Sequence, residues 1–364
     1  MPNHPPARSV ITDSWLTLPL ALSPSAERLT GADRQPMVYL GGDDRYLRLS
    51  PGAASLLDAL DGQTSAAQIL QRIGDGGDPL RAEHRRRTVL ETIDALRRAG
   101  AFTLSRGGGP ATGGWWRRWL LRTPRLRVRG GIDAVVAGPV ALAVGHPRLV
   151  RRCLAALALA SIALLVAGVS RFPNGIQIAW PVVAAVLLGE VVVHELAHAA
   201  VCRAYGVRIR EAGIMLWAWF LPLAYVDCTD IYRLPARRPR IMVALAGPFV
   251  DLVVGGAASA VALATRGEVS GTAFVILLSL VLVLVRNLTP LLPTDGYLAL
   301  EAATGELNLR HRAWLHLRAS ITGRRSRSRR HTAYVTYCVV SGVYAVAMFA
   351  FFVLELHATV GLLG

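Results

Sequence analysis

Two histidines and a glutamate lie within one apolar stretch, in the order His194-Glu195-Leu196-Ala197-His198. Residues four apart lie on the same face of a helix, so both imidazoles can bind one metal ion while Glu195 lies beside it. Tetrahedral zinc suits this spacing, and it needs a third protein ligand and an open position for water. Three ionisable residues in one lipid-embedded turn are costly to insert and are usually retained for function. The motif therefore predicts a catalytic Zn2+ site; the alternative is histidines that pair with other helices without a metal.

A second motif closes a later apolar stretch and provides a candidate third ligand. It reads Asn287-Leu288-Thr289-Pro290-Leu291-Leu292-Pro293-Thr294-Asp295-Gly296. Its prolines interrupt the helix, and its Asp-Gly pair favours a turn. Irregular backbone of this kind is tolerated at membrane depth only where it is buried or lines a wet cavity. We expect Asp295 to complete the metal site; the alternative is an aspartate that only forms the turn.

Apolar residues are unevenly distributed along the chain that must position these motifs. Of its 364 residues, 53% are hydrophobic, and the mean hydropathy is +0.40. Little before residue 130 is continuously apolar, whereas most of the later sequence is. This pattern predicts a mainly α polytopic membrane protein, with a soluble N-terminal module and a membrane domain over residues 149–364. The expected transmembrane helices lie at about residues 153–170, 178–204, 239–265, 271–290 and 333–356.

Arginine counts orient these spans. Residues 114–152 hold nine arginines, residues 203–240 seven and residues 297–332 eight, whereas residues 171–177 and 265–270 hold one each. Because basic segments stay in the cytoplasm, the N-terminal module should be cytoplasmic and the C-terminus should lie outside. The second and fourth spans then both run inward, so that both motifs lie toward the cytoplasmic side and can meet at one site.

The net charge of +16 does not indicate a nucleic-acid partner. All 40 basic residues are arginine, a bias typical of a high-G+C bacterial genome, and no helix-turn-helix with a basic face stands out. We therefore expect a multi-pass protein of the bacterial plasma membrane, with the lipid bilayer as a partner. The four cysteines are isolated and predict neither a disulfide framework nor a cysteine metal site. No secretory signal peptide is predicted at the N-terminus, and the oligomeric state stays open.

The N-terminal module is predicted to be a winged-helix-like α+β domain over residues 37–104, preceded by a flexible arm over residues 1–36. Two short strands flank a Gly-Gly-Asp-Asp turn, three helices follow, and a short strand closes the domain. Ser50-Pro51 begins the first helix, and Thr64 or Ser65 caps the second. In order, the expected elements lie at residues 37–40, 46–49, 51–60, 65–73, 81–99 and 101–104.

Residues 105–148 are expected to form a linker and an interfacial segment. Residues 105–114 are rich in glycine, and Trp115-Trp116-Arg117-Arg118-Trp119 is an aromatic and basic cluster suited to the cytoplasmic interface. Residues 132–144 are apolar but too short to span, which favours an interfacial or re-entrant segment.

The two chemical motifs resemble those of the site-2 protease family, peptidase family M50. That family carries HExxH in one core helix and Asn-x-x-Pro-x-x-Pro-x-Asp-Gly near the end of a later one. Ala246-Gly247-Pro248-Phe249-Val250-Asp251 is also similar to its Gly-Pro-x-x-Asn segment, although Asp251 replaces the usual Asn and leaves the local hydrogen bonding open. The resemblance covers roughly residues 150–300. Similar proteins place a hairpin or re-entrant segment near the substrate's entry, here within residues 207–232; a membrane-surface loop is the alternative.

This resemblance implies an intramembrane zinc metalloendopeptidase that cleaves a peptide or membrane-protein substrate near the cytoplasmic face. Zinc held by His194, His198 and Asp295 would activate water and polarise the scissile carbonyl. Glu195 would accept the water proton and pass it to the leaving amine. Asn287, by resemblance, would hydrogen-bond the substrate backbone or the developing oxyanion. No other cofactor is expected.

The N-terminal module resembles the PqqD-like domains that recognise ribosomally made peptides, through Tyr46-Leu47-Arg48-Leu49-Ser50-Pro51-Gly52-Ala53-Ala54 and the helices after it. A leader peptide would then add as a strand to the sheet edge beside the third helix. A winged helix for oligomerisation or regulation is the alternative.

Three functions compete for this domain combination. The first is maturation or leader removal of a ribosomally synthesised peptide, as in metallopeptidases of peptide natural-product clusters such as the daptide type. The second is regulated intramembrane proteolysis of a membrane-bound signalling protein. The third is a non-enzymatic membrane peptide-binding or immunity protein with a silent metal site. An intact set of ligands and an intact base argue against the third.

Overall fold

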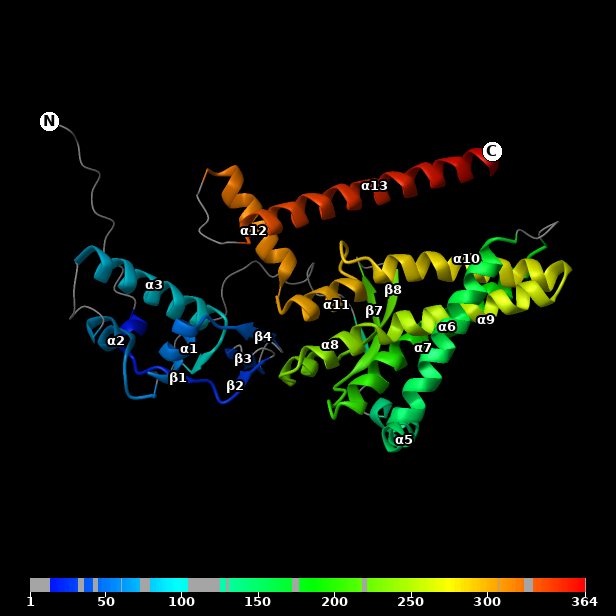
Figure 1. The fold of residues 1–364 in the computed structure, drawn as a ribbon. Coiled ribbons are helices and arrows are strands. Elements are labelled where there is room, and N and C mark those ends of the chain that lie inside the picture. The colour runs from blue at the N-terminus through cyan, green and yellow to red at the C-terminus, as the bar shows by residue number, and fades with distance from the viewer. Residues whose placement is uncertain are drawn as a thin grey trace. The chain divides into compact units, whose positions relative to one another are not determined.

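The computed structural model describes residues 14–31, 36–41, 45–59, 61–72, 79–103, 125–128, 131–171, 177–217, 221–306, 308–323 and 330–363. The chain divides into two compact units, Met1–Arg122 and Thr123–Gly364. Figure 1 shows the elements of each unit.

Over its described residues, the N-terminal unit contains a three-stranded antiparallel sheet, a two-stranded antiparallel pair, one 3-10 helix and three α-helices. The sheet has the order β2-β3-β4, and β1 pairs with β5. In chain order the elements are η1 (Ser14–Thr17), β1 (Ala21–Leu22), β2 (Ala26–Thr30), β3 (Pro36–Leu40), β4 (Arg45–Arg48), α1 (Pro51–Asp58), α2 (Ala66–Arg72), α3 (Pro79–Arg98) and β5 (Phe102–Thr103).

Capping residues set where the first two helices begin. The Ser50 hydroxyl accepts a hydrogen bond from the backbone N–H of Ala53 at 3.1 Å, and Pro51 takes the first helical position of α1. Ser65 and Gln68 form a reciprocal capping box at α2: the Ser65 N–H donates to Gln68 Oε1 at 2.8 Å, and the Gln68 N–H donates to Ser65 Oγ at 3.3 Å. Of the two caps expected from the sequence, Ser65 is the one used.

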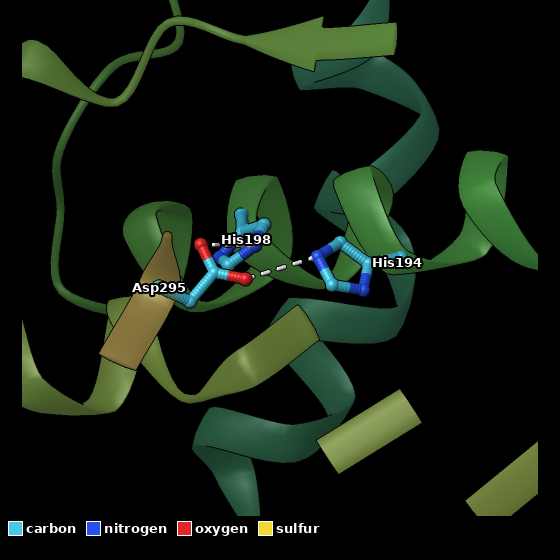
Figure 2. Close-up of side chains that lie close together, drawn as sticks. All are labelled: His194, His198 and Asp295. Atoms are coloured by element: carbon cyan, nitrogen blue, oxygen red, sulfur yellow. Dashed lines mark hydrogen bonds and ion pairs between the residues drawn. The ribbon is translucent and has the colours of Figure 1, made fainter. Parts of the chain in front are cut away.

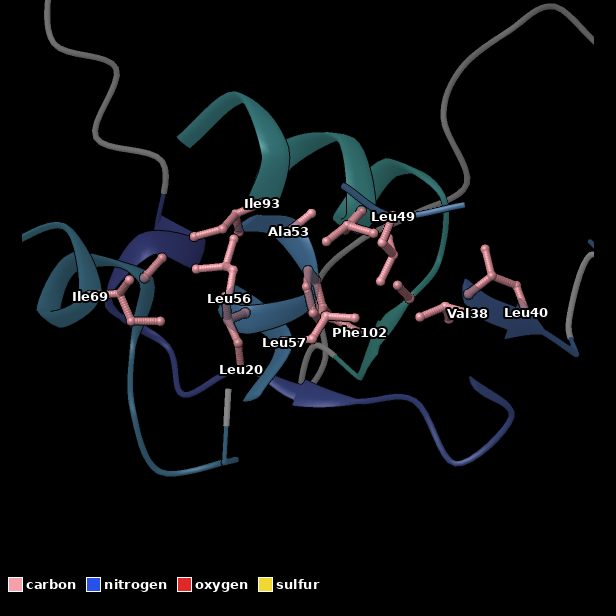
Figure 3. Packing of buried hydrophobic residues seen from close by; sticks show 13 residues of the cluster. Leu20, Val38, Leu40, Leu49, Ala53, Leu56, Leu57, Ile69, Ile93 and Phe102 are labelled. Atoms are coloured by element: carbon pink, nitrogen blue, oxygen red, sulfur yellow. The ribbon is translucent and has the colours of Figure 1, made fainter. Parts of the chain in front are cut away.

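Residues 14–31 differ from the flexible arm expected from the sequence. They form η1, β1 and β2, and the Leu20 side chain is fully buried. Leu20 packs with Val38, Leu57 and Ile93 in one apolar core (Figure 3). Because β2 pairs along the whole length of β3, this segment completes the sheet. The other expected strands and helices lie within a few residues of their predicted positions, while the winged-helix-like and PqqD-like interpretations stay predictions.

The C-terminal unit is mainly helical and carries one small sheet. Its elements are β6 (Arg125–Val128), α5 (Ile132–Gly145), α6 (Pro147–Val169), α7 (Trp180–Ala204), β7 (Ala212–Trp217), β8 (Leu221–Val226), η3 (Thr229–Arg233), α8 (Arg237–Ala244), α9 (Ala246–Ala264), α10 (Gly267–Leu288), α11 (Asp295–Thr304), α12 (Leu309–Ile321) and α13 (His331–Leu363).

Four helical segments of the described chain are long and apolar enough to cross a membrane: α6, α7, α8 with α9, and α10. They coincide with the first four expected spans and support a multi-pass membrane protein. The fifth expected span lies inside α13 and stays a prediction. Helix α5 has 14 residues and is too short to span; its interfacial position stays a prediction.

Helix α9 packs closely against α6 through small residues. A Cβ atom on Gly256 would lie 2.8 Å from the Cα of Ser161, and one on Gly168 would lie 2.9 Å from the Cβ of Ser259. The Ser259 hydroxyl donates a hydrogen bond to the Leu164 carbonyl. Small residues of this kind let helices approach where lipid provides no hydrophobic drive for association. Helix α9 also contacts α7, which carries the HExxH motif, and α10, at whose end the second motif begins.

The expected hairpin after α7 is present as β7 and β8, and a third strand joins it. The sheet has the antiparallel order β6-β7-β8, with Ala212 opposite Val226 and Arg127 opposite Gly213. This corrects the expected division of the chain, which assigned residues 105–148 to a linker and an interfacial segment. Residues 125–128 belong to the C-terminal unit because their backbone completes the ladder along β7.

Candidate metal centre

The structure brings the three expected metal ligands together. His194 and His198 lie one turn apart on α7, buried, with ring centroids 5.0 Å apart. Asp295 is the first residue of α11, 101 residues after His194. Its Oδ2 atom lies 3.2 Å from His194 Nε2, and its Oδ1 atom lies 3.6 Å from His198 Nε2 (Figure 2).

The other ring nitrogen of each histidine is held by an acceptor, which orients the imidazole. His194 Nδ1 lies 2.6 Å from Asp251 Oδ1, and His198 Nδ1 lies 2.7 Å from the Val243 carbonyl oxygen. A carboxylate oxygen and a carbonyl oxygen accept hydrogen bonds, so the network assigns the hydrogen to Nδ1 in both rings, with Nδ1 as the donor. Both Nε2 lone pairs then point toward Asp295, the tautomer that metal-binding histidines adopt.

The donor set fits a tetrahedral ion. Bonds of about 2.0–2.1 Å at tetrahedral angles place neighbouring ligand atoms roughly 3.3 Å apart. The distances run to different oxygens of the Asp295 carboxylate, 3.2 Å from His194 Nε2 to Oδ2 and 3.6 Å from His198 Nε2 to Oδ1, and each lies close to that value. Nitrogen from two imidazoles with one carboxylate oxygen is a set that zinc accepts.

Gly247 keeps the space in front of the histidines open. A Cβ atom at this position would lie 2.2 Å from His194 Nε2 and 2.5 Å from His198 Nε2. That point is about one metal–nitrogen bond from both atoms. Any residue larger than glycine would therefore fill the volume that a metal ion needs.

A break between α8 and α9 presents both Gly247 and the Val243 carbonyl to α7. Pro248 has no N–H, and its ring clashes with the carbonyl four residues earlier, so an uninterrupted helix is disfavoured here. The helix breaks at Leu245. The Val243 carbonyl then accepts from His198 Nδ1.

The loop before α11 delivers Asp295 to the site. Helix α10 ends at Leu288, and Thr289 is extended, as expected for a residue before proline. The Thr294 hydroxyl donates to the Thr289 carbonyl at 2.7 Å and closes the loop. Gly296 is required because a Cβ there would lie 2.2 Å from the Leu288 carbonyl oxygen. The Asp-Gly pair thus combines a ligand with a close backbone approach.

Asp295 is prepared as an anionic ligand. Burial alone would raise its pKa. In the absence of a metal the two imidazoles can also carry a hydrogen on Nε2, and their hydrogen bonds and positive charges then outweigh burial and lower the pKa of Asp295 to about 2. A carboxyl group with this pKa is ionised at neutral pH, the form that binds a metal. Its place at the start of α11 adds favourable interaction with the helix dipole.

Residues 182–274 match the family model of Peptidase family M50. The matched segment contains the HExxH motif and Asp251 and ends before Asn287 and Asp295. The match indicates a metalloprotease. An uncharacterized protein of Methanocaldococcus jannaschii is 35% identical over 69 residues, which is 19% of this chain and 19% of that protein, so the chain spans about a fifth of this relative's length. No solved structure matches the chain.

Glu195, inside the M50-matching segment, lies beside the metal ligands without belonging to their group. It is half-buried on α7, between the two histidines in sequence. Helix α7, which carries Glu195, contacts β8. A carboxylate next to the ligands, on a helix that contacts a strand, is placed to act on a water molecule or on a bound peptide.

Asn287 occupies a different environment from the one expected. The residue is buried, and its Nδ2 donates to Asp251 Oδ2 at 2.9 Å. The substrate contact expected of Asn287 stays a prediction. Asp251 and Gly247 received no role from the sequence. Their spacing was the available signal, since residues four apart on α9 lie on one face.

Proposed function

We propose that this chain is a zinc metalloendopeptidase that hydrolyses a peptide bond near the cytoplasmic face of a bacterial plasma membrane. The observation that carries the proposal is the convergence of His194 Nε2, His198 Nε2 and the Asp295 carboxylate, within 4.8 Å of one another. The M50 match over residues 182–274 supports the same activity.

The ligands and Glu195 divide the chemistry between them. His194, His198 and Asp295 would hold the zinc, which supplies a water of lowered pKa and polarises the scissile carbonyl. Glu195 would accept a proton from the attacking water and pass it to the leaving amine. The Nδ1 hydrogen bonds to Asp251 and Val243 keep both imidazoles oriented through the reaction.

The free edge of β8 supports an extended peptide as substrate. The Asp227 N–H donates to the Glu211 carbonyl, so that pair exchanges hydrogen bonds, and by alternation Tyr225 also bonds to β7. The N–H and C=O groups of Ala224 and Val226 then point away from β7. Among the described residues, β8 pairs only with β7. A peptide that adds to this edge would lie near α7, the helix that carries Glu195 and contacts β8.

Strand addition also removes the obstacle that a helical substrate presents. Carbonyl groups inside a helix are hydrogen-bonded along the helix axis and shielded from attack. A segment drawn onto the β8 edge is extended, so its carbonyls alternate toward and away from the sheet. The substrate class that follows is a peptide or membrane protein with a segment that can unwind locally.

The N-terminal unit favours maturation of a ribosomally synthesised peptide among the candidate functions. Its sheet ends on one side in β4 (Arg45–Arg48), which in the described chain pairs only with β3. We propose that this PqqD-like unit lies in the cytoplasm and captures a leader peptide by strand addition. Leader removal would follow at the metal centre. Regulated proteolysis of a membrane-bound signalling protein would use the same metal centre without a leader.

Metal content and cleavage by the detergent-solubilised protein test the proposal. The wild type, Glu195→Gln and Asp295→Ala would be purified side by side and incubated with a co-expressed candidate precursor. We expect near-stoichiometric zinc in the wild type and in Glu195→Gln. Loss of the general base should reduce cleavage about 10²- to 10⁴-fold, while Asp295→Ala should lose zinc as well as activity.

Three results would count against the proposal. If the wild type binds no zinc after reconstitution, the protease function is excluded and a peptide-binding or immunity role is favoured. Full activity in Glu195→Gln would exclude Glu195 as the general base. Equal cleavage of precursors with and without a leader would remove leader recognition and favour regulated proteolysis.

A further inference from the structure

A buried row of hydrogen-bonded side chains lies on the side of His194 that faces away from Asp295. His194 Nδ1 contacts Asp251 Oδ1 at 2.6 Å, and the second oxygen of that carboxylate accepts from Asn287 Nδ2 at 2.9 Å. Asp251 and Asn287 are both buried. These hydrogen bonds connect α7, α9 and α10. The relative positions of these three helices determine whether the metal ligands stay aligned.

We propose that Asn287 and Asp251 are positioning residues that act in series on His194, and that Asn287 serves the metal site instead of contacting substrate. The inference rests on the proposed metallopeptidase function and assigns these residues within the same site. Asp251 holds the Nδ1–H of His194 and makes Nε2 a stronger donor to the metal. Asn287 holds Asp251 in the orientation that this bond needs.

The neighbours of Asn287 determine which way its amide group points. Arg286 Nη2 donates to Asn287 Oδ1 at 3.2 Å, so the amide oxygen faces a cation and the amide nitrogen faces Asp251. A flipped amide would place oxygen against the Asp251 carboxylate and nitrogen against the arginine, two repulsive contacts. One of the two N–H donors of the amide is therefore committed to Asp251, and the Asn287 side chain is buried.

The two histidines are supported by groups of different charge. His198 Nδ1 bonds to the neutral Val243 carbonyl, whereas His194 Nδ1 bonds to a carboxylate. A hydrogen bond to an ionised acceptor is roughly twice as strong as one to a neutral acceptor. The strength with which His194 Nε2 donates its lone pair to a metal therefore depends on a side chain, Asp251, whereas that of His198 depends on a backbone carbonyl. Substitutions at Asp251 should consequently lower zinc affinity, although Asp251 is not itself a metal ligand.

A second cation is the competing explanation for this cluster. Glu190, His194 and Asp251 offer three ligand atoms within 4.8 Å of one another. Glu190 Oε1 is buried without a hydrogen-bond partner and lies 3.9 Å from His194 Nδ1. The 2.6 Å between His194 Nδ1 and Asp251 Oδ1 is a hydrogen-bond distance, well below the roughly 3.3 Å expected between two ligands of one tetrahedral ion. The short contact favours positioning over a second metal.

Metal affinity measured without substrate tests the inference separately from cleavage. Wild type, Asp251→Asn and Asn287→Ala would be compared in detergent by competition with a chromophoric zinc chelator and by the visible spectrum after cobalt substitution. Ser259→Ala is the matched control, because it removes another buried hydrogen bond from α9 away from the histidines. Asp251→Asn keeps the shape of the side chain, so a folding failure in a smaller variant would not end the test.

We expect one zinc per chain, with affinity about 10- to 100-fold lower in Asp251→Asn and reduced in the same direction in Asn287→Ala. The cobalt spectrum should shift in both variants and stay unchanged in Ser259→Ala. For cleavage, Asn287→Ala should recover part of its kcat at saturating zinc without a change in KM.

Two results would overturn the inference. Unchanged zinc affinity in Asn287→Ala together with a raised KM would assign Asn287 to the substrate. Two metal ions per chain, one of them lost in Asp251→Asn, would assign the cluster to a second cation. The proposed function and the positioning role fail on different results. If zinc affinity depends on Asp251 but the protein cleaves no peptide, the positioning role stands and the peptidase function fails. If zinc affinity and cleavage are both unchanged in Asp251→Asn, the peptidase function stands and the positioning role fails.

Discussion

Gly247 packs so closely on His194 that a Cβ atom at position 247 would lie 2.2 Å from the imidazole Nε2. The contact joins α9 to α7 at the point where the metal would bind. Glycine at this position therefore has a chemical role as well as a packing role, because it is the absence of a side chain that leaves the ligand atom accessible.

The first prediction is that Gly247→Ala lowers metal affinity without unfolding the protein. Overpacking costs about 1–3 kcal/mol, which corresponds to roughly 5- to 150-fold in the dissociation constant if the strain falls on the bound state. Chelator competition would measure the affinity, and thermal unfolding in detergent would measure the stability.

Gly189→Ala is the control for this substitution. Gly189 lies on α7, and a Cβ there would meet nothing within 4 Å. Its zinc affinity should equal that of the wild type. Equal affinities in both variants would mean that the space in front of Gly247 is not the metal site.

The second prediction concerns the free edge of β8. Ala224→Pro removes an N–H that points away from β7, so the hairpin should persist while substrate pairing weakens. One lost backbone hydrogen bond is worth about 0.5–1.5 kcal/mol, or roughly a 2- to 12-fold rise in KM. Steady-state cleavage of the precursor would measure it.

Ala224→Val keeps the N–H and adds similar bulk, which makes it the control. Its KM should stay near that of the wild type, and the zinc content of both variants should be unchanged. If Ala224→Val raises KM as much as Ala224→Pro, the side chain and not the backbone meets the substrate, and strand addition at β8 is excluded.

The third prediction concerns the contact between α6 and α9. Gly256→Ala would place a Cβ 2.8 Å from the backbone of Ser161, which should destabilise the protein by about 1–3 kcal/mol. Gly138→Ala in α5 meets nothing within 4 Å and should be neutral or slightly stabilising. Thermal midpoints in the same detergent would compare them; an unchanged midpoint in Gly256→Ala would show that the helices can separate without cost.

The fourth prediction is a pH dependence of the N-terminal unit. Backbone N–H groups of Gln63 and Thr64 donate to Asp61 Oδ1 at 2.9 and 2.8 Å and lower the pKa of Asp61 below its usual value of 3.8. Because the folded-state pKa is depressed, the stabilisation is fully present above the unfolded-state pKa and is lost as pH falls through the lower folded value.

Asp61→Asn should lose this acid-dependent component. Hydrogen exchange of the α2 amides, compared between the variant and the wild type at each pH, would measure it, since intrinsic exchange rates cancel. The wild type should be the more protected protein above pH 4 and approach the variant below that value. A constant difference at all pH values would show that the charge of Asp61 contributes nothing.

Local patterns were sufficient for the helices and for the candidate ligands. The apolar stretches around α6, α7, α9 and α10 predicted segments of spanning length, and helical periodicity placed His194 and His198 on one face. Local patterns did not predict the first two strands of the N-terminal unit, β1 and β2. Residues 21–22 and 26–30 are short, and their pairing partners β5 and β3 come later in the chain.

The sequence by itself determined that two histidines, a glutamate and a distant aspartate could meet in a helical membrane protein; the cytoplasmic side stays a prediction. Only the tertiary structure decided what lies behind each imidazole. Asp251 is 57 residues from His194, and the Val243 carbonyl is 45 residues from His198. Spacing within a helix extends only over a few turns. These partners depend on the break at Leu245 between α8 and α9 and on how both helices pack on α7, which is set by contacts between helices far apart in the chain.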